Sequence, residues 1–199
     1  MLFIFKIKKN NQQNKGFTIV ELLVVFALMI IMSSIVVFKY RDFSDSMELH
    51  NIAYDVALAI REAQVFGISS RGTTTQESFL YGYGVNFSTT LATDKYGSYI
   101  SFIDSIGNNL WFDTGTVETL KKTDFPNGYK IYELCSTPLS GVENCAPTIL
   151  NILFQRPNVD AIIKSPTTTN DISAKIKLNA PSGRTAEVHI YKSGQVSVQ

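Results

Sequence analysis

One stretch limits what this chain can fold into: residues 17–38, FTIVELLVVFALMIIMSSIVVF, where Glu21 is the only charged side chain. A helix over these 22 residues extends ~33 Å. That length is sufficient to cross the hydrocarbon core of a bilayer. The sequence therefore predicts a transmembrane helix over residues 17–38.

Glu21 is the informative residue of this stretch. A carboxylate at membrane depth costs roughly 2.5–3.5 kcal/mol, although one near the end of a helix can partly reach the interface. Glu21 is therefore either a tolerated interfacial charge or a charge that awaits a partner. If the chain is cut between Gly16 and Phe17, a free α-amino group arises one helical turn from Glu21. In a bundle of identical helices, that ammonium and a neighbour's Glu21 would neutralise each other.

These residues resemble the type IV pilin and pseudopilin superfamily. The resemblance rests on a short basic leader that ends in Lys15-Gly16, followed by the run from Phe17 to Leu23, FTIVELL. It implies cleavage after Gly16 by the prepilin peptidase and N-methylation of Phe17 by the same enzyme. It also implies that Glu21 sets subunit register in a filament, with other pilin subunits and an inner-membrane assembly platform as partners.

Charge predicts the topology. The leader carries no acid, and its four lysines are Lys6, Lys8, Lys9 and Lys15. Beyond the helix, Lys39 and Arg41 are offset by Asp42 and Asp45. The positive-inside rule places the N-terminus in the cytoplasm and the C-terminal domain outside, as a single-pass inner-membrane protein. An ordinary secretory signal is disfavoured because the apolar core of such a signal is shorter than residues 17–38. The alternative that ranks second is a transmembrane anchor that is not cleaved.

The chain that would follow cleavage is mildly acidic. Removal of residues 1–16 leaves 14 basic and 17 acidic side chains, a formal net charge of −3. Global charge therefore gives no reason to expect nucleic acid as a partner.

The two cysteines, Cys135 and Cys145, flank STPLSGVEN, a stretch with the composition of a loop. Outside the cytoplasm such a pair is expected to form a disulfide that closes the loop. Two free thiols are the alternative. The spacing does not fit CxxC redox or zinc chemistry.

Beyond the apolar stretch, the pattern becomes that of an amphipathic helix with an expected stop at Gly67. Apolar residues recur on one helical face. They are Leu49, Ile52, Ala53, Val56, Ala57, Ile60 and Ala63.

After residue 70 the sequence has short alternating runs separated by turn residues, which is typical of β-strands. We expect strands at residues 80–88, 99–104, 110–112, 129–134, 150–155, 161–164, 172–178, 187–191 and 195–198. A long helix followed only by strands predicts an α+β fold with an antiparallel β domain packed on the helix. The expected parts are a leader (1–16), a transmembrane helix (17–38), an amphipathic helix (39–70) and a globular β domain (71–199).

A looser resemblance extends over nearly the whole chain. The runs ALAIREAQVFGISSRG, GYGVNF, YISFIDSIGNNLWFD, FQRP and VHIYKSGQVSV look like minor pseudopilins of the GspH/FimT type. This resemblance implies β-sheets packed against the C-terminal half of the helix.

The sequence offers little for catalysis. His50 and His189, the two histidines, are expected to be structural. The GxG within Tyr81–Val85 lacks a third glycine and a following helix, so it does not predict a nucleotide site. Asp104, Asn108, Asn109 and Asp113 are better explained as turn residues than as calcium ligands. No cofactor and no enzymatic activity are predicted.

One local charge asymmetry supports DNA binding as a hypothesis, since some pilus subunits of the FimT kind bind DNA. Residues 172–199 contain four basic side chains against Glu187 alone. They are Lys175, Lys177, Arg184 and Lys192. A local basic patch can attract phosphate, but ordinary solubility explains the same residues.

The sequence thus predicts a minor subunit of a type IV pilus or a type II secretion pseudopilus that assembles through its N-terminal helix. Two alternatives stay open. One is a membrane-tethered binding module without cleavage. The other is a DNA-binding or adhesive subunit, for which Trp111, Phe112 and the tyrosines are candidate surface residues.

Overall fold

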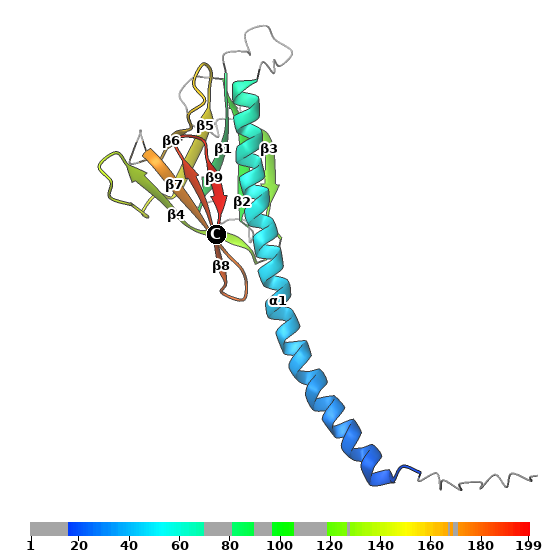
Figure 1. The fold of residues 1–199 in the computed structure, drawn as a ribbon. Coiled ribbons are helices and arrows are strands. Elements are labelled where there is room, and N and C mark those ends of the chain that lie inside the picture. The colour runs from blue at the N-terminus through cyan, green and yellow to red at the C-terminus, as the bar shows by residue number, and fades with distance from the viewer. Residues whose placement is uncertain are drawn as a thin grey trace, which may run out of the picture. The chain divides into compact units, whose positions relative to one another are not determined.

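The computed structural model describes residues 16–69, 81–89, 97–105, 119–126, 128–166, 168 and 171–199. The chain forms two units that divide between Arg41 and Asp42. Helix α1 (Ile19–Ile68) contributes to both units, and all the described strands belong to the second (Figure 1). Each described strand pair is antiparallel. The predicted α+β fold is therefore confirmed.

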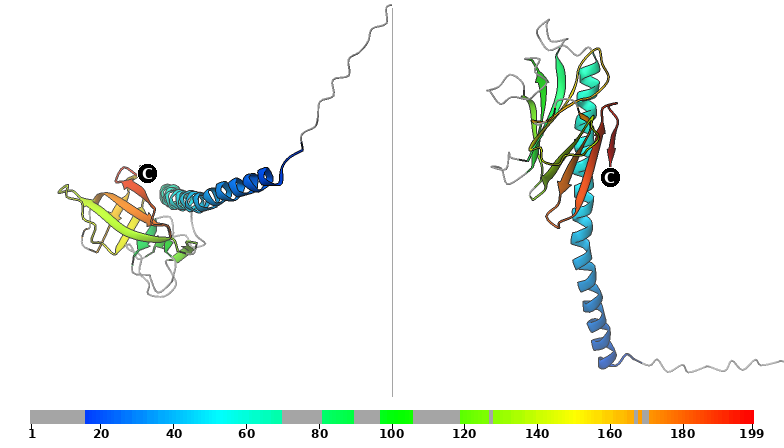
Figure 2. Two further views of the ribbon diagram at one scale, coloured as in Figure 1. Left: turned by 90° about the horizontal axis from the view of Figure 1, so that it is seen from below. Right: turned by 90° about the vertical axis from the view of Figure 1, so that its left-hand side faces the viewer.

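The strands of the second unit form two sheets. The first has the order β3-β2-β1-β5-β6, from β1 (Gly82–Ser88), β2 (Ser98–Asp104), β3 (Thr119–Asp124), β5 (Ile149–Phe154) and β6 (Ile162–Lys164). The second has the order β4-β7-β8-β9, from β4 (Lys130–Pro138), β7 (Asp171–Asn179), β8 (Thr185–Tyr191) and β9 (Val196–Val198). Both sheets lie against the C-terminal part of α1, and one core contains residues from all three (Figure 2).

The helical face predicted from periodicity is the face that meets this core. The buried residues are Leu49, Ile52, Ala53, Val56, Ala59, Ile60 and Ala63. Ala57 is only partly buried, because it lies at the border of the face. This burial, rather than helix propensity, holds this part of α1 in place.

Buried and more exposed side chains alternate along β7 and β8, as expected for strands with one face toward the core. The inward residues are Ala174, Ile176 and Leu178 on β7, and Ala186, Val188 and Ile190 on β8. The intervening residues, among them Lys175, Lys177, Glu187 and His189, lie on the opposite face. The second sheet therefore presents a polar outer face.

Strand β4 is longer than the sequence predicts. The predicted strand ends at Leu134, with a loop after Cys135, but β4 continues to Pro138. Cys135 and Ser136 are buried within it. The reason is pairing: β7 offers nine residues as a partner, and β4 follows it through two register shifts. The composition of the stretch gave no sign of this partner.

Strand β3 was not predicted at all. Apart from Leu120, its residues, TLKKTD, are polar, and most are exposed; among the described strands it pairs only with β2, at the edge of the first sheet. Charged residues on an edge discourage pairing with other chains, which explains the missing alternation. The predicted strand at 110–112, with Trp111 and Phe112, lies outside the described residues, as do most of the leader and Asn108, Asn109 and Asp113.

Gly67 has a different role from the predicted helix stop. It is buried inside α1, which ends one residue later at Ile68. A Cβ atom at this position would overlap the backbone carbonyl of Phe154 on β5. Gly67 therefore permits a close approach between helix and sheet. The terminal carbonyl of Ile68 instead accepts a hydrogen bond from Arg156 Nε at 2.6 Å.

Candidate functional site

The predicted processing site lies immediately before α1. Gly16, Phe17 and Thr18 are outside the helix, and the side chain of Phe17 is 84% exposed. The first helical backbone bond runs from the Leu22 amide to the Thr18 carbonyl at 3.2 Å. The Glu21 amide donates to Thr18 Oγ1, also at 3.2 Å. Thr18 is therefore the N-cap of α1, and Glu21 occupies its third helical position.

Sequence reasoning missed this role of Thr18. The signal was present, because Thr18-Ile19-Val20-Glu21 fits the Thr-x-x-Glu pattern of a capping box. From the sequence, Glu21 was interpreted as a tolerated interfacial charge or as a charge that awaits a partner, and Thr18 was given no capping role. The structure shows that the residue three positions before it fixes where the helix begins.

The apolar span Ile19–Val37 in the first unit buries no side chain. Ile19–Val37 is long and apolar enough to span a membrane, and none of it is buried within the chain. Its exposed residues include Leu23, Phe26 and Ile31, each more than half exposed. Within the part of the chain that the structure describes, Glu21 forms no ion pair. Apolar surface of this extent requires lipid or other protein as its surroundings.

A family model for the prokaryotic N-terminal methylation motif matches residues 11–37. The matched region contains the predicted cut site, the N-cap, Glu21 and the apolar span. This N-terminus is that of the type IV pilin and pseudopilin superfamily. The motif supports a type IV pilin-like protein of the kind that prepilin peptidase processes. The match ends at residue 37 and does not identify the member of the superfamily. No match was found among curated proteins or among solved structures.

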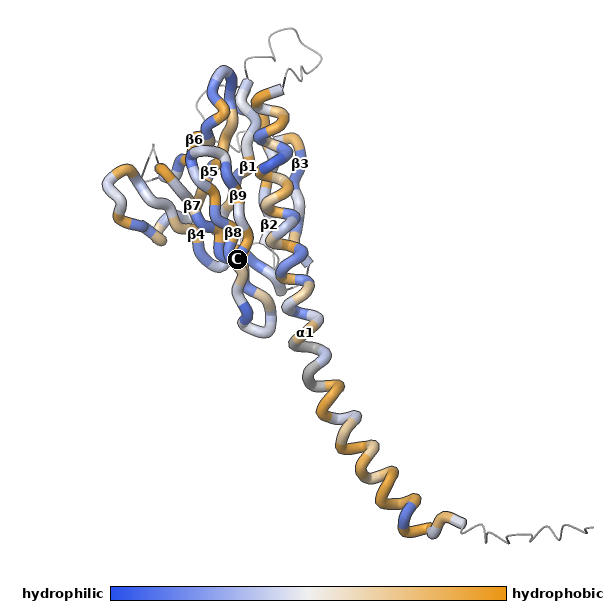
Figure 3. Tube along the Cα trace, viewed as in Figure 1, coloured by the Kyte–Doolittle hydropathy of each residue, from blue (hydrophilic) through white to orange (hydrophobic). Residues whose placement is uncertain are grey.

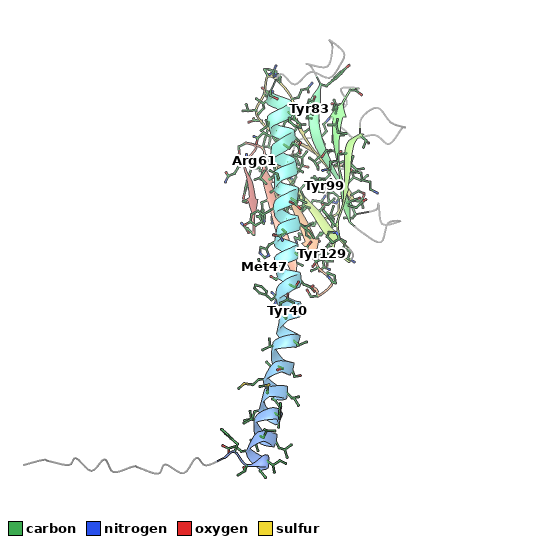
Figure 4. The ribbon with its side chains drawn as sticks, turned by 90° about the vertical axis from the view of Figure 1, so that its right-hand side faces the viewer. Tyr40, Met47, Arg61, Tyr83, Tyr99 and Tyr129 are labelled. Atoms are coloured by element: carbon green, nitrogen blue, oxygen red, sulfur yellow. A yellow bond between two sulfur atoms is a disulfide. The ribbon has the colours of Figure 1, made fainter. Side chains whose placement is uncertain are left out.

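In the second unit of this pilin-like chain, the helix has a second apolar stripe opposite its buried face. It consists of Phe43, Met47, Tyr54, Leu58 and Val65, each more than half exposed. Successive members are four or seven residues apart, so they line one side of a helix. Met47, one member of this stripe, is labelled on α1 in Figure 4. We call these five residues the outer stripe.

Cys135 and Cys145 form a disulfide. The bond attaches residues 139–147 to β4, the edge strand of the second sheet. Beside it, Ser136 and Asn144 exchange two backbone hydrogen bonds of 2.8 Å. The loop therefore covers part of the exposed edge of β4. The two sulfurs also lie near Glu133, but sulfurs bonded to each other do not offer thiolate ligands to a metal.

The four residues of the predicted nucleic-acid patch do not gather in one place. Lys175 and Lys177 share the outer face of β7, as predicted. Arg184 and Lys192 lie in the turns at opposite ends of β8, roughly 26 Å apart for an extended strand. The basic side chains are therefore dispersed over the sheet.

Two of these lysines are also neutralised by carboxylates. Lys175 pairs with Glu143, and Lys177 pairs with Glu133, both at 2.6 Å. The hydrogen bond to Glu133 raises the pKa of Lys177, which keeps the lysine charged. Both acids lie outside residues 172–199, so counting charges in that stretch missed them. The structure therefore does not support a basic patch here.

The histidines each have a local partner. His50 Nδ1 lies 2.8 Å from the Ser46 carbonyl one turn back on α1. His189 Nε2 lies 3.1 Å from Glu187 on the outer face of β8. The two residues lie on different elements, each engaged with its own neighbour.

Proposed function

We propose that this chain is a minor pilin or pseudopilin, a structural subunit of a type IV pilus or a type II secretion pseudopilus. Prepilin peptidase cuts it after Gly16 and methylates Phe17. The uncut chain spans the inner membrane once, with its N-terminus in the cytoplasm and residues 42–199 outside. The loose sequence resemblance favours the GspH/FimT type within this group.

The observation that carries the proposal is the fully exposed apolar span with one carboxylate near its start. Lipid satisfies the apolar side chains, but it leaves Glu21 without a counter-charge. Transfer of the helix into a bundle keeps the apolar surface covered. It also supplies Glu21 with the Phe17 ammonium of a neighbouring subunit, in surroundings of low dielectric constant. Assembly is therefore favoured by a pairing that a lone helix lacks.

The outer stripe supports the same conclusion for the second unit. Core packing requires only the face that contains Val56 and Ile60. An apolar stripe on the opposite side has no partner within the described chain, and subunit packing supplies one. The dispersed, ion-paired lysines give no comparable support to DNA binding.

The proposal is tested by replacing Glu21 in cells that carry the assembly machinery. Glu21→Leu removes the charge, and Glu21→Gln removes it with little change of shape. We expect both variants to insert into the membrane at normal levels and to be largely missing from sheared filaments or pseudopili. Glu62→Leu is the matched control, because Glu62 is an exposed acid on the same helix in the second unit.

Immunoblots of membrane and filament fractions measure the outcome. Normal amounts of Glu21→Leu in filaments would contradict the pairing mechanism. An unprocessed chain that never enters filaments, even as wild type, would favour the membrane-tethered module instead. Incorporation into pili but not pseudopili would assign the chain to a type IV pilus, and the reverse would assign it to a type II secretion pseudopilus.

A further inference from the structure

The peptide bond between Gly16 and Phe17 lies just outside the helix in the structure. Neither residue is helical, and a Cβ atom placed on Gly16 would meet no other atom within 4 Å. Within the described residues, the backbone groups of Gly16 and Phe17 form no hydrogen bond to other backbone groups. The bond is therefore free of both helical hydrogen bonding and side-chain cover.

Thr18 is what places the start of the helix. Ile19 and Val20 are β-branched residues of modest helix propensity, so propensity does not define this terminus. The side chain of Thr18 satisfies the Glu21 amide, one of the otherwise unpaired first-turn donors. In apolar surroundings, an unpaired amide is especially unfavourable. The cap therefore selects one helix start over neighbouring ones.

We propose that Thr18 is a positioning residue for leader removal, which rests on the processing proposed above. Its cap holds the Gly16–Phe17 bond at a fixed, short distance before the helix, in the non-helical form that a peptidase binds. In the hydrolysis, water adds to the Gly16 carbonyl carbon and the C–N bond breaks. Gly16 leaves with a carboxylate, and Phe17 retains the amine. Thr18 touches none of these atoms and acts only through the helix start.

The cap affects cleavage through the fraction of chains with the correct helix start. Without it, the first turn either frays or extends toward Gly16, and both changes remove the bond from its position. A lower competent fraction lowers apparent affinity in proportion. Loss of an N-cap corresponds to a change of about fivefold in such an equilibrium. We therefore expect kcat/KM for leader cleavage to fall, by about fivefold at most.

The experiment uses the full-length chain in phosphatidylethanolamine–phosphatidylglycerol vesicles with purified prepilin peptidase. Loss of residues 1–16 is followed by mass spectrometry. Thr18→Val keeps the shape but removes the acceptor, and it is expected to slow cleavage, by about fivefold at most. Thr18→Ser, Thr18→Asn and Thr18→Asp each supply an N-cap and are expected to restore most of the rate. Ser33→Ala removes a hydroxyl from the interior of the same helix and is the matched control.

Amide hydrogen exchange at Glu21 gives a second readout. The amide should exchange faster in Thr18→Val than in wild type, and it should regain protection in the Ser, Asn and Asp variants. Rescue by Ser alone would mean that the peptidase recognises the hydroxyl itself, which overturns the proposal. Unchanged cleavage of Thr18→Val, or slow cleavage without faster exchange, overturns it as well. If the wild-type chain is not cut after Gly16, the proposed function fails instead.

Discussion

Two regions of α1 have apolar side chains in different surroundings. In the first unit, Ile19–Val37 is apolar on every side and wholly exposed. In the second unit, apolar and polar residues alternate along the helix, and one face is buried against two sheets (Figure 3). In the second region one apolar face is covered within the chain and only the outer stripe stays exposed, whereas every side of the first requires lipid or neighbouring subunits. Matched substitutions in the two regions should therefore affect different properties.

The largest difference is expected between Ile60→Ala and Ile31→Ala. Ile60 is 0% exposed and Ile31 is 59% exposed, although both are isoleucines of the same helix. Ile60→Ala should lower the free energy of unfolding of the second unit by about 2–5 kcal/mol, because it leaves a cavity in the core. Ile31→Ala should leave that free energy within about 0.5 kcal/mol of wild type. Denaturant unfolding in detergent measures both. Equal losses would mean that the two units unfold as one.

The disulfide should stabilise only the second unit. Replacing both Cys135 and Cys145 with serine removes a bond that closes a loop with a sequence separation of 10 residues. A loop of this length corresponds to about 2–3 kcal/mol from restriction of the unfolded chain. The measurement is the unfolding midpoint with and without reductant, and wild type treated with reductant should behave as the double variant does. Insertion of the apolar helix into membranes should stay unchanged.

A smaller loss is expected for Gly67→Ala. The added methyl group would overlap the Phe154 carbonyl, so helix and sheet must move apart. Overpacking of this kind costs about 1–3 kcal/mol. Ala63→Gly, one turn earlier on the same face, is a useful control because it removes bulk rather than adds it. If Gly67→Ala were as stable as wild type, α1 and β5 would not lie as close together at Gly67 as they do in the structure.

The smallest effect concerns the Lys177–Glu133 pair. Because Lys177 and Glu133 are 27% and 32% exposed, Lys177→Gln should cost only about 0.2–1 kcal/mol near neutral pH. Glu133 raises the pKa of Lys177 in the folded state above its ordinary value of 10.5. The stabilisation is therefore fully present below pH 10.5 and is lost as the pH rises through the folded-state pKa.

The free energy of unfolding of wild type and of Lys177→Gln is measured at neutral pH and again above the folded-state pKa of Lys177. The difference between the two proteins should be smaller at the higher pH. Added salt should also reduce it, because the pair is partly exposed. A difference that grows with pH would contradict the pairing.

Sequence reasoning succeeded where the deciding interactions are local. The apolar span and the methylation motif are read from consecutive residues, and the buried face of α1 from helical spacing. Strand β3 could not be found in this way, because its polar sequence forms a strand only by pairing with β2. The extension of β4 to Pro138 likewise depends on β7, which begins more than thirty residues later in the chain.

The candidate site shows the same division. Gly16, Phe17 and Glu21 were predicted from a short motif as processing and assembly residues, and Thr18 belongs to a pattern that was also visible in the sequence. The carboxylates that pair with the β7 lysines were not found from the sequence, because Glu133 and Glu143 come from elsewhere in the chain. Whether Gly67 ends the helix or packs against a sheet depends on the position of Phe154, which spacing does not reveal.

The account depends most on the chemical form of the N-terminus in the native protein. Intact-mass and N-terminal fragment spectra of protein purified from its own membranes measure this form directly. The account predicts a chain that begins at Phe17, lacks residues 1–16 and carries one added methyl group on the Phe17 nitrogen. A native protein that still begins at Met1, with no shortened and methylated form, would contradict it.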